Sequence, residues 1–199
     1  VSSNPKDDED NWLEIWNNVF MEYYADWTES LTKLKNQNVD TGMWFERMCK
    51  VLQWKETVYE TDLFLPIIKL ISKYVELPYK GNERRMRIIA DHLRTALVLI
   101  NDGCIPSNVG AGYVLRMLIR RMYYNFLLLN KEGNIDWLVL DVLKFFVSIY
   151  PLSTKNIDIS ILWEISQFKK TIDNWIKLLE QLLSKNTTIS WEDAFKLYD

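Results

Sequence analysis

The sequence has few of the residues from which disulfide frameworks and metal sites are built. Its 199 residues include two cysteines, Cys49 and Cys104, and one histidine, His92. Two widely spaced cysteines predict neither a disulfide framework nor a zinc site, and they favour a reducing, cytoplasmic compartment. A packing or hydrogen-bonding role is expected for His92, because no cysteine or serine stands beside it as a catalytic partner.

The sequence also lacks an excess of positive charge and a long apolar run. The net charge is −3, so no global basic field attracts nucleic acid, and an RNA surface has to be a local patch. The most apolar stretch, residues 137–150, contains Asp141 and Lys144 and is too short to span a bilayer. Neither a DNA nor a membrane partner is expected. The start is polar and acidic, unlike a signal peptide, and lacks an initiator methionine, so we expect a piece of a longer protein.

The pattern of apolar residues predicts a small β part followed by helices. Residues 13–24 are rich in β-branched and aromatic side chains and predict a strand, and residues 39–43 predict a second one after a polar connector at 26–38. From residue 57 onward apolar residues recur with helical spacing. The expected fold class is α+β, predominantly α, with a short antiparallel strand stub. Helices are predicted at residues 44–53, 60–75, 83–100, from a cap at 106–108 to 129, at 136–150, 159–184 and 190–199.

The string Val39–Arg47 combines an acid, a bare backbone position and a guanidinium where a strand turns into a helix. Asp40 can pair with an ammonium group, and Gly42 lets a substrate approach the backbone closely. Arg47 can grip a phosphate with two parallel hydrogen bonds. On spacing alone, the string also fits a plain strand-to-helix turn with exposed Glu46 and Arg47.

Val39–Arg47 resembles motif 3 of class II aminoacyl-tRNA synthetases in its alanyl-tRNA synthetase form, V-D-T-G-M-G-L-E-R. Arg87–Arg94, followed by residues 102–108, resembles that family's R-x-I-A-D-H-x-R and D-G-x-x-P-S-N run. Further matches follow the order of the family at residues 16–21, 112–121 and 194–199.

The resemblance implies part of an alanine–tRNA ligase, which activates alanine with ATP and Mg²⁺ and transfers it to tRNA(Ala). Residues 1–56 would be the C-terminal part of the class II catalytic domain, and residues 57–199 a helical domain that recognises the tRNA acceptor stem. Motifs 1 and 2 are not in this chain, so it is not expected to be active alone. The alternative is a non-catalytic, synthetase-like module that binds RNA or protein.

The resemblance also implies roles for individual residues at the amino-acid and ATP sites. Arg47 would be the catalytic residue, in contact with the terminal phosphate of ATP. Glu14 would sit at the ATP and magnesium site, or it is only a strand-edge carboxylate. The implied alanine site, in which the aspartate holds the ammonium and the glycine forms the floor, consists of Asn17, Val19, Asp40 and Gly42.

On the RNA side, Asn108 and Asp199 would read the G3·U70 wobble pair of the acceptor stem. The wobble leaves the guanine amino group without a partner in the wide, shallow minor groove, where an amide or carboxylate oxygen can accept from it. Arg116 and Arg120 are spaced i,i+4 on one helical face, with Arg121 about a quarter-turn further round. They would contact phosphates, which positions the RNA without specifying its sequence. A solvated basic face is the alternative.

The sequence departs from the family pattern at several positions, three of which bear on the predicted sites. Trp44 replaces a glycine, and its indole could crowd the nucleotide site or face the core. Ala111 and Met117 replace arginines, which removes two phosphate contacts. Nearby, Gly110 and Gly112 either let an RNA backbone approach or serve helix packing.

Overall fold

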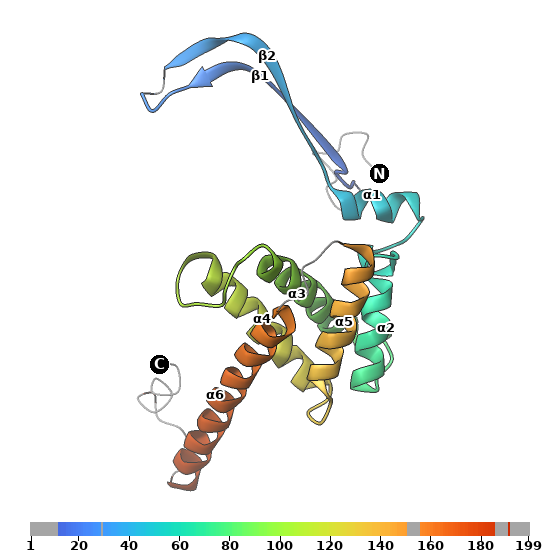
Figure 1. The fold of residues 1–199 in the computed structure, drawn as a ribbon, viewed down its shortest axis with the longest axis vertical. Coiled ribbons are helices and arrows are strands. Elements are labelled where there is room, and N and C mark those ends of the chain that lie inside the picture. The colour runs from blue at the N-terminus through green and yellow to red at the C-terminus, as the bar shows by residue number, and fades with distance from the viewer. Residues whose placement is uncertain (1–11, 29, 151–155, 186–190, 192–199) are drawn as a thin grey trace. The chain divides into compact units, whose positions relative to one another are not determined.

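The computed structural model describes residues 12–28, 30–150, 156–185 and 191. The chain divides into two compact units, Val1–Leu65 and Pro66–Asp199. The first holds a two-stranded antiparallel sheet and a short helix, and the second is helical (Figure 1). The predicted fold class, α+β and predominantly α, is confirmed.

The sheet is a long ribbon of β1 (Trp16–Ala25) and β2 (Leu31–Met43). The predicted first strand is confirmed, with its start three residues later than expected. The predicted connector at residues 26–38 is wrong, because β2 already begins at Leu31. The first half of β2 is polar, but a strand pairs through its backbone and needs no apolar side chain to do so.

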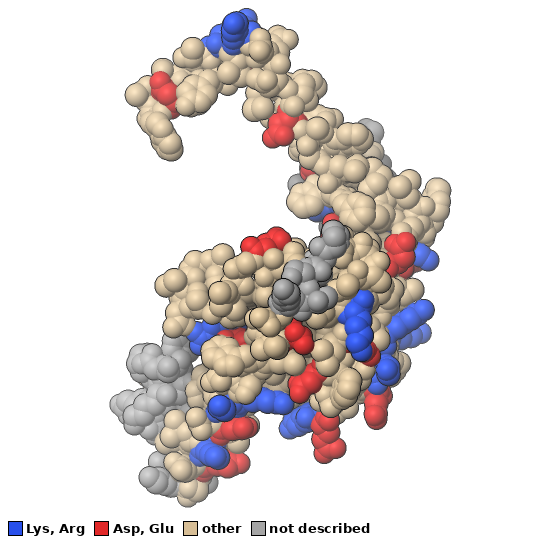
Figure 2. All heavy atoms as spheres, viewed as in Figure 1, with Lys and Arg blue, Asp and Glu red and all other residues tan. Residues whose placement is uncertain are grey.

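Both faces of this ribbon are exposed. Every residue of β1 is exposed, and large apolar side chains are among them, including Phe20 at 80% and Trp27, beside the turn, at 103%. In Figure 2 this ribbon carries few charged side chains. An isolated two-stranded hairpin is marginally stable at best in water. The ribbon therefore presents apolar surface that nothing in the described part of the chain covers.

The ribbon leads into α1 (Phe45–Leu52), which confirms the predicted helix at residues 44–53 to within one residue. A one-turn 3₁₀ helix, η3 (Val58–Glu60), follows. Two reciprocal hydrogen bonds connect the end of α1 to the residues after η3. Gln53 Nε2 donates to Asp62 Oδ1 at 2.6 Å, and the Asp62 backbone N–H donates to Gln53 Oε1 at 3.1 Å.

The helical unit follows the predicted periodicity to within two residues at nearly every helix end. The exception is the first helix, which begins at Leu65 and not at residue 60. Pro66 explains this difference, because a proline has no N–H and fits a helix only in its first turn. The predicted helix at 190–199 lies outside the described residues. The helices of this unit are α2 (Leu65–Val75), α3 (Glu83–Asn101), α4 (Gly110–Leu129), α5 (Ile135–Ile149) and α6 (Ile157–Lys185).

The start of α4 differs from its predicted capping. The N-cap residue is Val109, which has no side chain able to cap, so the prediction that residues 106–108 cap the helix is wrong. The Ser107 hydroxyl instead donates to the Val109 carbonyl at 3.0 Å. Gly112 lies against the preceding loop, where a Cβ would overlap Ser107 and the Ile105 carbonyl. Of the two roles expected for Gly112, the structure shows packing.

The core of the helical unit lies between α3 and α4, with α2, α5 and α6 packed around it. His92 is buried in α3, with its Nδ1 3.1 Å from the carboxylate of Asp91. None of the helices in the described residues is long and apolar enough to cross a membrane. The large, fully buried side chains of the two helices are spaced three or four residues apart: Met86, Ile89, Leu93 and Leu97 on α3 and Leu115, Ile119, Met122 and Phe126 on α4.

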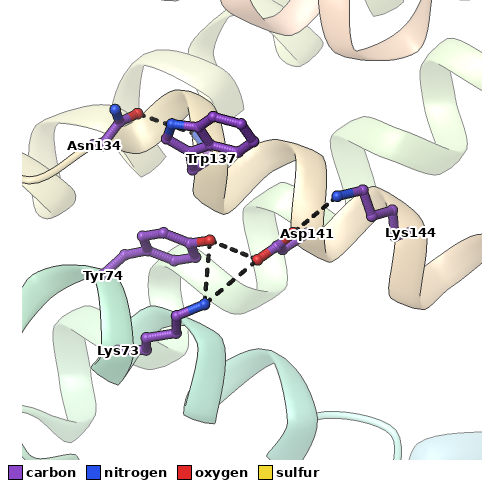
Figure 3. A network of polar contacts seen from close by, with 6 residues as sticks. All are labelled: Lys73, Tyr74, Asn134, Trp137, Asp141 and Lys144. Carbon is purple, nitrogen blue, oxygen red and sulfur yellow. Dashed lines mark hydrogen bonds and ion pairs between the residues drawn. The ribbon is translucent and has the colours of Figure 1, made fainter.

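A polar network joins α2 to α5 (Figure 3). The Tyr74 hydroxyl donates to Asp141 Oδ2 at 2.5 Å, and Lys144 Nζ donates to Asp141 Oδ1 at 3.2 Å. Lys73 Nζ lies 3.8 Å from the same carboxylate. The hydrogen bonds from Tyr74 and then Lys144 lower the pKa of Asp141, and the bond to Asp141 raises the pKa of Tyr74.

We expect Tyr74→Phe to lower the free energy of unfolding at pH 7 by about 1–2 kcal/mol, because it removes a hydrogen bond to a charged group. The folded-state pKa of Asp141 is lowered, so its stabilisation is present above the unfolded-state value of about 4 and is lost as the pH falls through the folded-state pKa. The difference between wild type and variant should therefore shrink in acid. Urea unfolding at pH 7 and at about pH 3 measures both effects.

The matched control is Tyr113→Phe, which removes the same hydroxyl from an exposed tyrosine with no hydrogen bond to a described residue. This control should unfold like wild type at both pH values. Equal stability of Tyr74→Phe and wild type at pH 7 would contradict the role given to the Tyr74–Asp141 bond.

Candidate functional site

Four residues of the ribbon, two from each strand, line one hollow of about 500 Å³. Asn17 pairs with Gly42 and Val19 pairs with Asp40 across the antiparallel ladder. Directly opposed residues share a face of the sheet, and so do residues two apart on one strand. The four residues predicted to bind alanine therefore lie together on one face, and all four line the hollow.

The hollow has an acidic residue and an open floor. Glu14 precedes β1 and also lines the hollow, where its Oε1 accepts a hydrogen bond from Asn17 Nδ2 at 3.2 Å. Gly42 has no atom within 4 Å of where a Cβ would stand, so the space above its backbone is free. Carboxylates at Glu14 and Asp40 give the hollow the charge that would attract an ammonium group.

Arg47 is held beside this hollow by two contacts. Its Nη1 donates to the backbone carbonyl of Glu14 at 2.8 Å. Its guanidinium lies over the indole of Trp44, 4.5 Å from the ring centroid. Among the described residues only the Glu14 carbonyl accepts a hydrogen bond from this guanidinium, which leaves four of its five N–H donors for a phosphate.

The stacking between Arg47 and Trp44 shows where the indole of Trp44 lies. Trp44 is 51% exposed, so its indole does not face a core. It lines the hollow and supports the guanidinium of Arg47. Stacking of this kind restricts the guanidinium and is worth about 0.5–1 kcal/mol at an exposed site. The residue that departs from the family's glycine thus orients the predicted catalytic arginine.

A second hollow, of about 490 Å³, lies in the helical unit and includes Asn108. Arg116 lines it and donates to Asn108 Oδ1. No other hydrogen bond of this side chain is formed with a described residue, so the carbonyl oxygen has a second lone pair and the amide both N–H donors for a base edge. Arg116 fixes the orientation of this exposed amide.

Arg116 and Arg120 are neither freely solvated nor unpaired. Both pair with Glu164 on α6, with its Oε1 2.6 Å from Arg120 Nε and 3.3 Å from Arg116 Nε. The Glu164 side chain is 4% exposed, so a buried carboxylate anchors both arginines. The guanidinium of Arg120 also lies 5.0 Å from the ring centroid of Phe168. The alternative of a solvated basic face is therefore wrong for these two residues.

The remaining predicted RNA residues do not join this hollow. Arg121 is exposed and lines a different hollow, between α4 and the start of α3. Asp199 lies outside the described residues. The predicted RNA residues that the structure describes are thus divided between two faces of the helical unit.

Glu164 was missed by reasoning from the sequence, although a signal for it is present. It stands in α6 between Ile161 and Ile165, both buried, so it interrupts an apolar stripe. A carboxylate at such a position is almost never buried without a partner. That stripe could have predicted a buried ion pair, but not which arginines form it.

The model of the family described as tRNA synthetases class II (A) matches residues 1–199. The chain therefore belongs to the class II tRNA synthetase family, which confirms the resemblance to that family.

Within that family the chain is similar to alanine–tRNA ligases. It is 37% identical over 202 residues to the alanine–tRNA ligase of Thermotoga maritima and 38% identical over 204 residues to that of Neisseria gonorrhoeae. These matches cover 98% and 100% of this chain, and 23% of each ligase. The chain thus spans about a quarter of the length of the curated relatives it matches.

Proposed function

We propose that the protein containing this chain is an alanine–tRNA ligase. It would activate alanine with ATP to alanyl-adenylate and then transfer the alanyl group to the 3′ end of tRNA(Ala). The observation that carries the proposal is the single hollow shared by Asn17, Val19, Asp40 and Gly42, next to Arg47. The names of the relatives support the same reaction.

In the amino-acid half of this reaction, Asp40 would bind the ammonium of alanine. Val19 lies directly opposite and would limit the space for the side chain. Such a pocket rejects larger amino acids by overlap, but it separates alanine from glycine by only one methyl, worth about 1–3 kcal/mol. The pocket alone therefore gives a modest preference over glycine.

In the nucleotide half, Arg47 would bind the terminal phosphate of ATP as the residue of motif 3. The described residues offer less for Mg²⁺ than for the phosphate. Among the described residues, no three histidine, cysteine, aspartate or glutamate side chains are grouped to hold a metal ion. Mg²⁺ usually binds through substrate phosphates and one or two carboxylates, and Glu14 is the candidate here.

The exposed ribbon supports the assignment of two parts of this chain to two functions of a larger protein. Its uncovered apolar faces would pack against the rest of the class II catalytic domain, of which residues 1–56 would be the C-terminal part. Residues 57–199 would recognise the acceptor stem, with Asn108 and Asp199 reading the G3·U70 pair and Arg116 and Arg120 placed near the phosphates. We expect this protein to work in the cytoplasm, where Cys49 and Cys104, both free thiols, stay reduced.

Alanine-dependent exchange of pyrophosphate into ATP, measured on the full-length protein, tests the proposal. Alanine should support exchange, glycine should support it about 10–200 times less well, and leucine should not support it. Absence of exchange with alanine would contradict the ligase reaction. If the protein then still binds acceptor-stem RNA, the non-catalytic binding module is the correct function.

A further inference from the structure

A third hollow in the helical unit, of about 400 Å³, gathers basic side chains from two helices. Arg84 and Arg85 come from the first turn of α3, and Arg121 comes from the middle of α4. All three are exposed. The sequence separates Arg121 from the other two by more than thirty residues, so only the fold brings these cations together.

The positive charge of this hollow is only partly offset within the described part of the chain. None of the three arginines has an ion pair there, whereas Arg116 and Arg120 share Glu164. Glu83 is the one carboxylate among the described residues that line the hollow, and it accepts the backbone N–H of Gly81 at 2.9 Å. Its charge offsets that of one arginine, so the lining keeps an excess of positive charge. Three like charges around one hollow repel each other, and an anion bound between them would relieve that repulsion.

The chemistry of the lining selects a phosphate ligand. Guanidinium groups are planar forks that bind phosphate oxygens through two parallel hydrogen bonds. The hollow is open to solvent and its other lining residues include the amides Asn82 and Asn125 and the ring of Tyr124. An open, basic and polar hollow fits the phosphate backbone of a nucleic-acid strand that passes along the protein surface. It offers no nucleophile or acid–base pair for a reaction.

We propose that Arg84, Arg85 and Arg121 form a second RNA-backbone site, separate from the face that carries Asn108. This inference rests on the proposed function, because it assigns the site to the same RNA. Arg120 and Arg121 are neighbours on α4, but their side chains point about 100° apart. Arg120 therefore pairs with Glu164, whereas Arg121 lines this hollow. The second site would position the RNA without reading its sequence.

The test is RNA binding by the 199-residue chain carrying Arg84→Gln, Arg85→Gln and Arg121→Gln together. Affinity for an acceptor-stem hairpin should fall about tenfold or more at low salt. The slope of log affinity against log salt should become shallower by about two to three, because each phosphate that an arginine no longer binds lowers it by about one. The preference between hairpins that differ at the third base pair should be retained, because the backbone carries no sequence information.

The matched control removes the same charge elsewhere, through Lys69→Gln, Lys170→Gln and Lys177→Gln. These lysines are exposed and do not line the hollow. This control should bind like wild type with nearly the same salt slope. Circular dichroism should show the same helix content for all three proteins.

The possible failures can be told apart. If the wild-type chain binds no hairpin, the role in acceptor-stem recognition proposed for residues 57–199 fails with it. If the wild-type chain binds but the arginine variant matches the lysine control, only the second site is wrong. Tight binding of inorganic pyrophosphate that depends on these arginines, with RNA affinity unchanged, would identify a free-phosphate site and overturn the RNA assignment.

Discussion

Arg47→Ala in the full-length protein should slow alanine-dependent pyrophosphate exchange by about a hundredfold or more. The guanidinium is already oriented, since it is fixed by the Glu14 carbonyl and stacked on Trp44. Fixed donors aimed at developing phosphate charge stabilise the transition state without reorganisation, and losing one such group typically costs about 10²–10³ in rate. The loss should appear in kcat/KM for ATP, while KM for alanine stays near its wild-type value.

Two further variants sharpen this experiment. Arg47→Lys keeps the charge but loses the planar fork and the stacking on Trp44, so it should recover only part of the rate. Lys50→Ala removes a cation from the last turn of the same helix and should leave exchange unchanged. A wild-type rate in Arg47→Ala would remove this residue from the nucleotide site.

Local sequence patterns predicted most of the helices and half of the ribbon. The helical spacing of apolar residues predicted α3 and α4, because burial of one face is a local property of the sequence. The polar half of β2 was missed, since its pairing with β1 depends on backbone hydrogen bonds to a distant segment. The start of α2 was misplaced although Pro66 marked it.

The four residues that the resemblance assigns to the amino-acid site share one hollow, whereas those it assigns to RNA do not all lie together, and the roles of both sets remain predictions. Residues 17–19 and 40–42 face one another across two paired strands, and strand periodicity fixes which residues share a face. The position of the Trp44 indole could have been predicted from its distance of three residues to Arg47, which is one helical turn. The assignment of residues 1–56 and 57–199 to two functions remains a prediction.

The arrangement of the arginines could not be predicted. Spacing placed Arg116 and Arg120 on one face, but Glu164 stands 44 residues after Arg120 and comes from another helix. Only the packing of α4 against α6 converts a basic stripe into a buried ion pair. The gathering of Arg84, Arg85 and Arg121 likewise depends on how α3 packs on α4.

Recognition of the wobble pair is the second prediction with a large effect. In the proposed complex the unpaired guanine amino group would donate to the Asn108 carbonyl oxygen, whose only described partner is Arg116. A hairpin with A-U at the third pair has no such amino group, so the amide loses a hydrogen bond and keeps the cost of desolvation. That loss is about 1–3 kcal/mol, or about tenfold or more in affinity.

Titration of the 199-residue chain with two acceptor-stem hairpins, one with G·U and one with A-U at the third pair, tests this most directly. The G·U hairpin should bind about tenfold more tightly. Asn108→Ala should bring both hairpins to the same affinity, whereas Asn174→Ala, at an exposed asparagine of α6, should keep the preference. Equal binding of both hairpins by the wild-type chain would contradict the proposal that this segment reads the acceptor stem of tRNA(Ala).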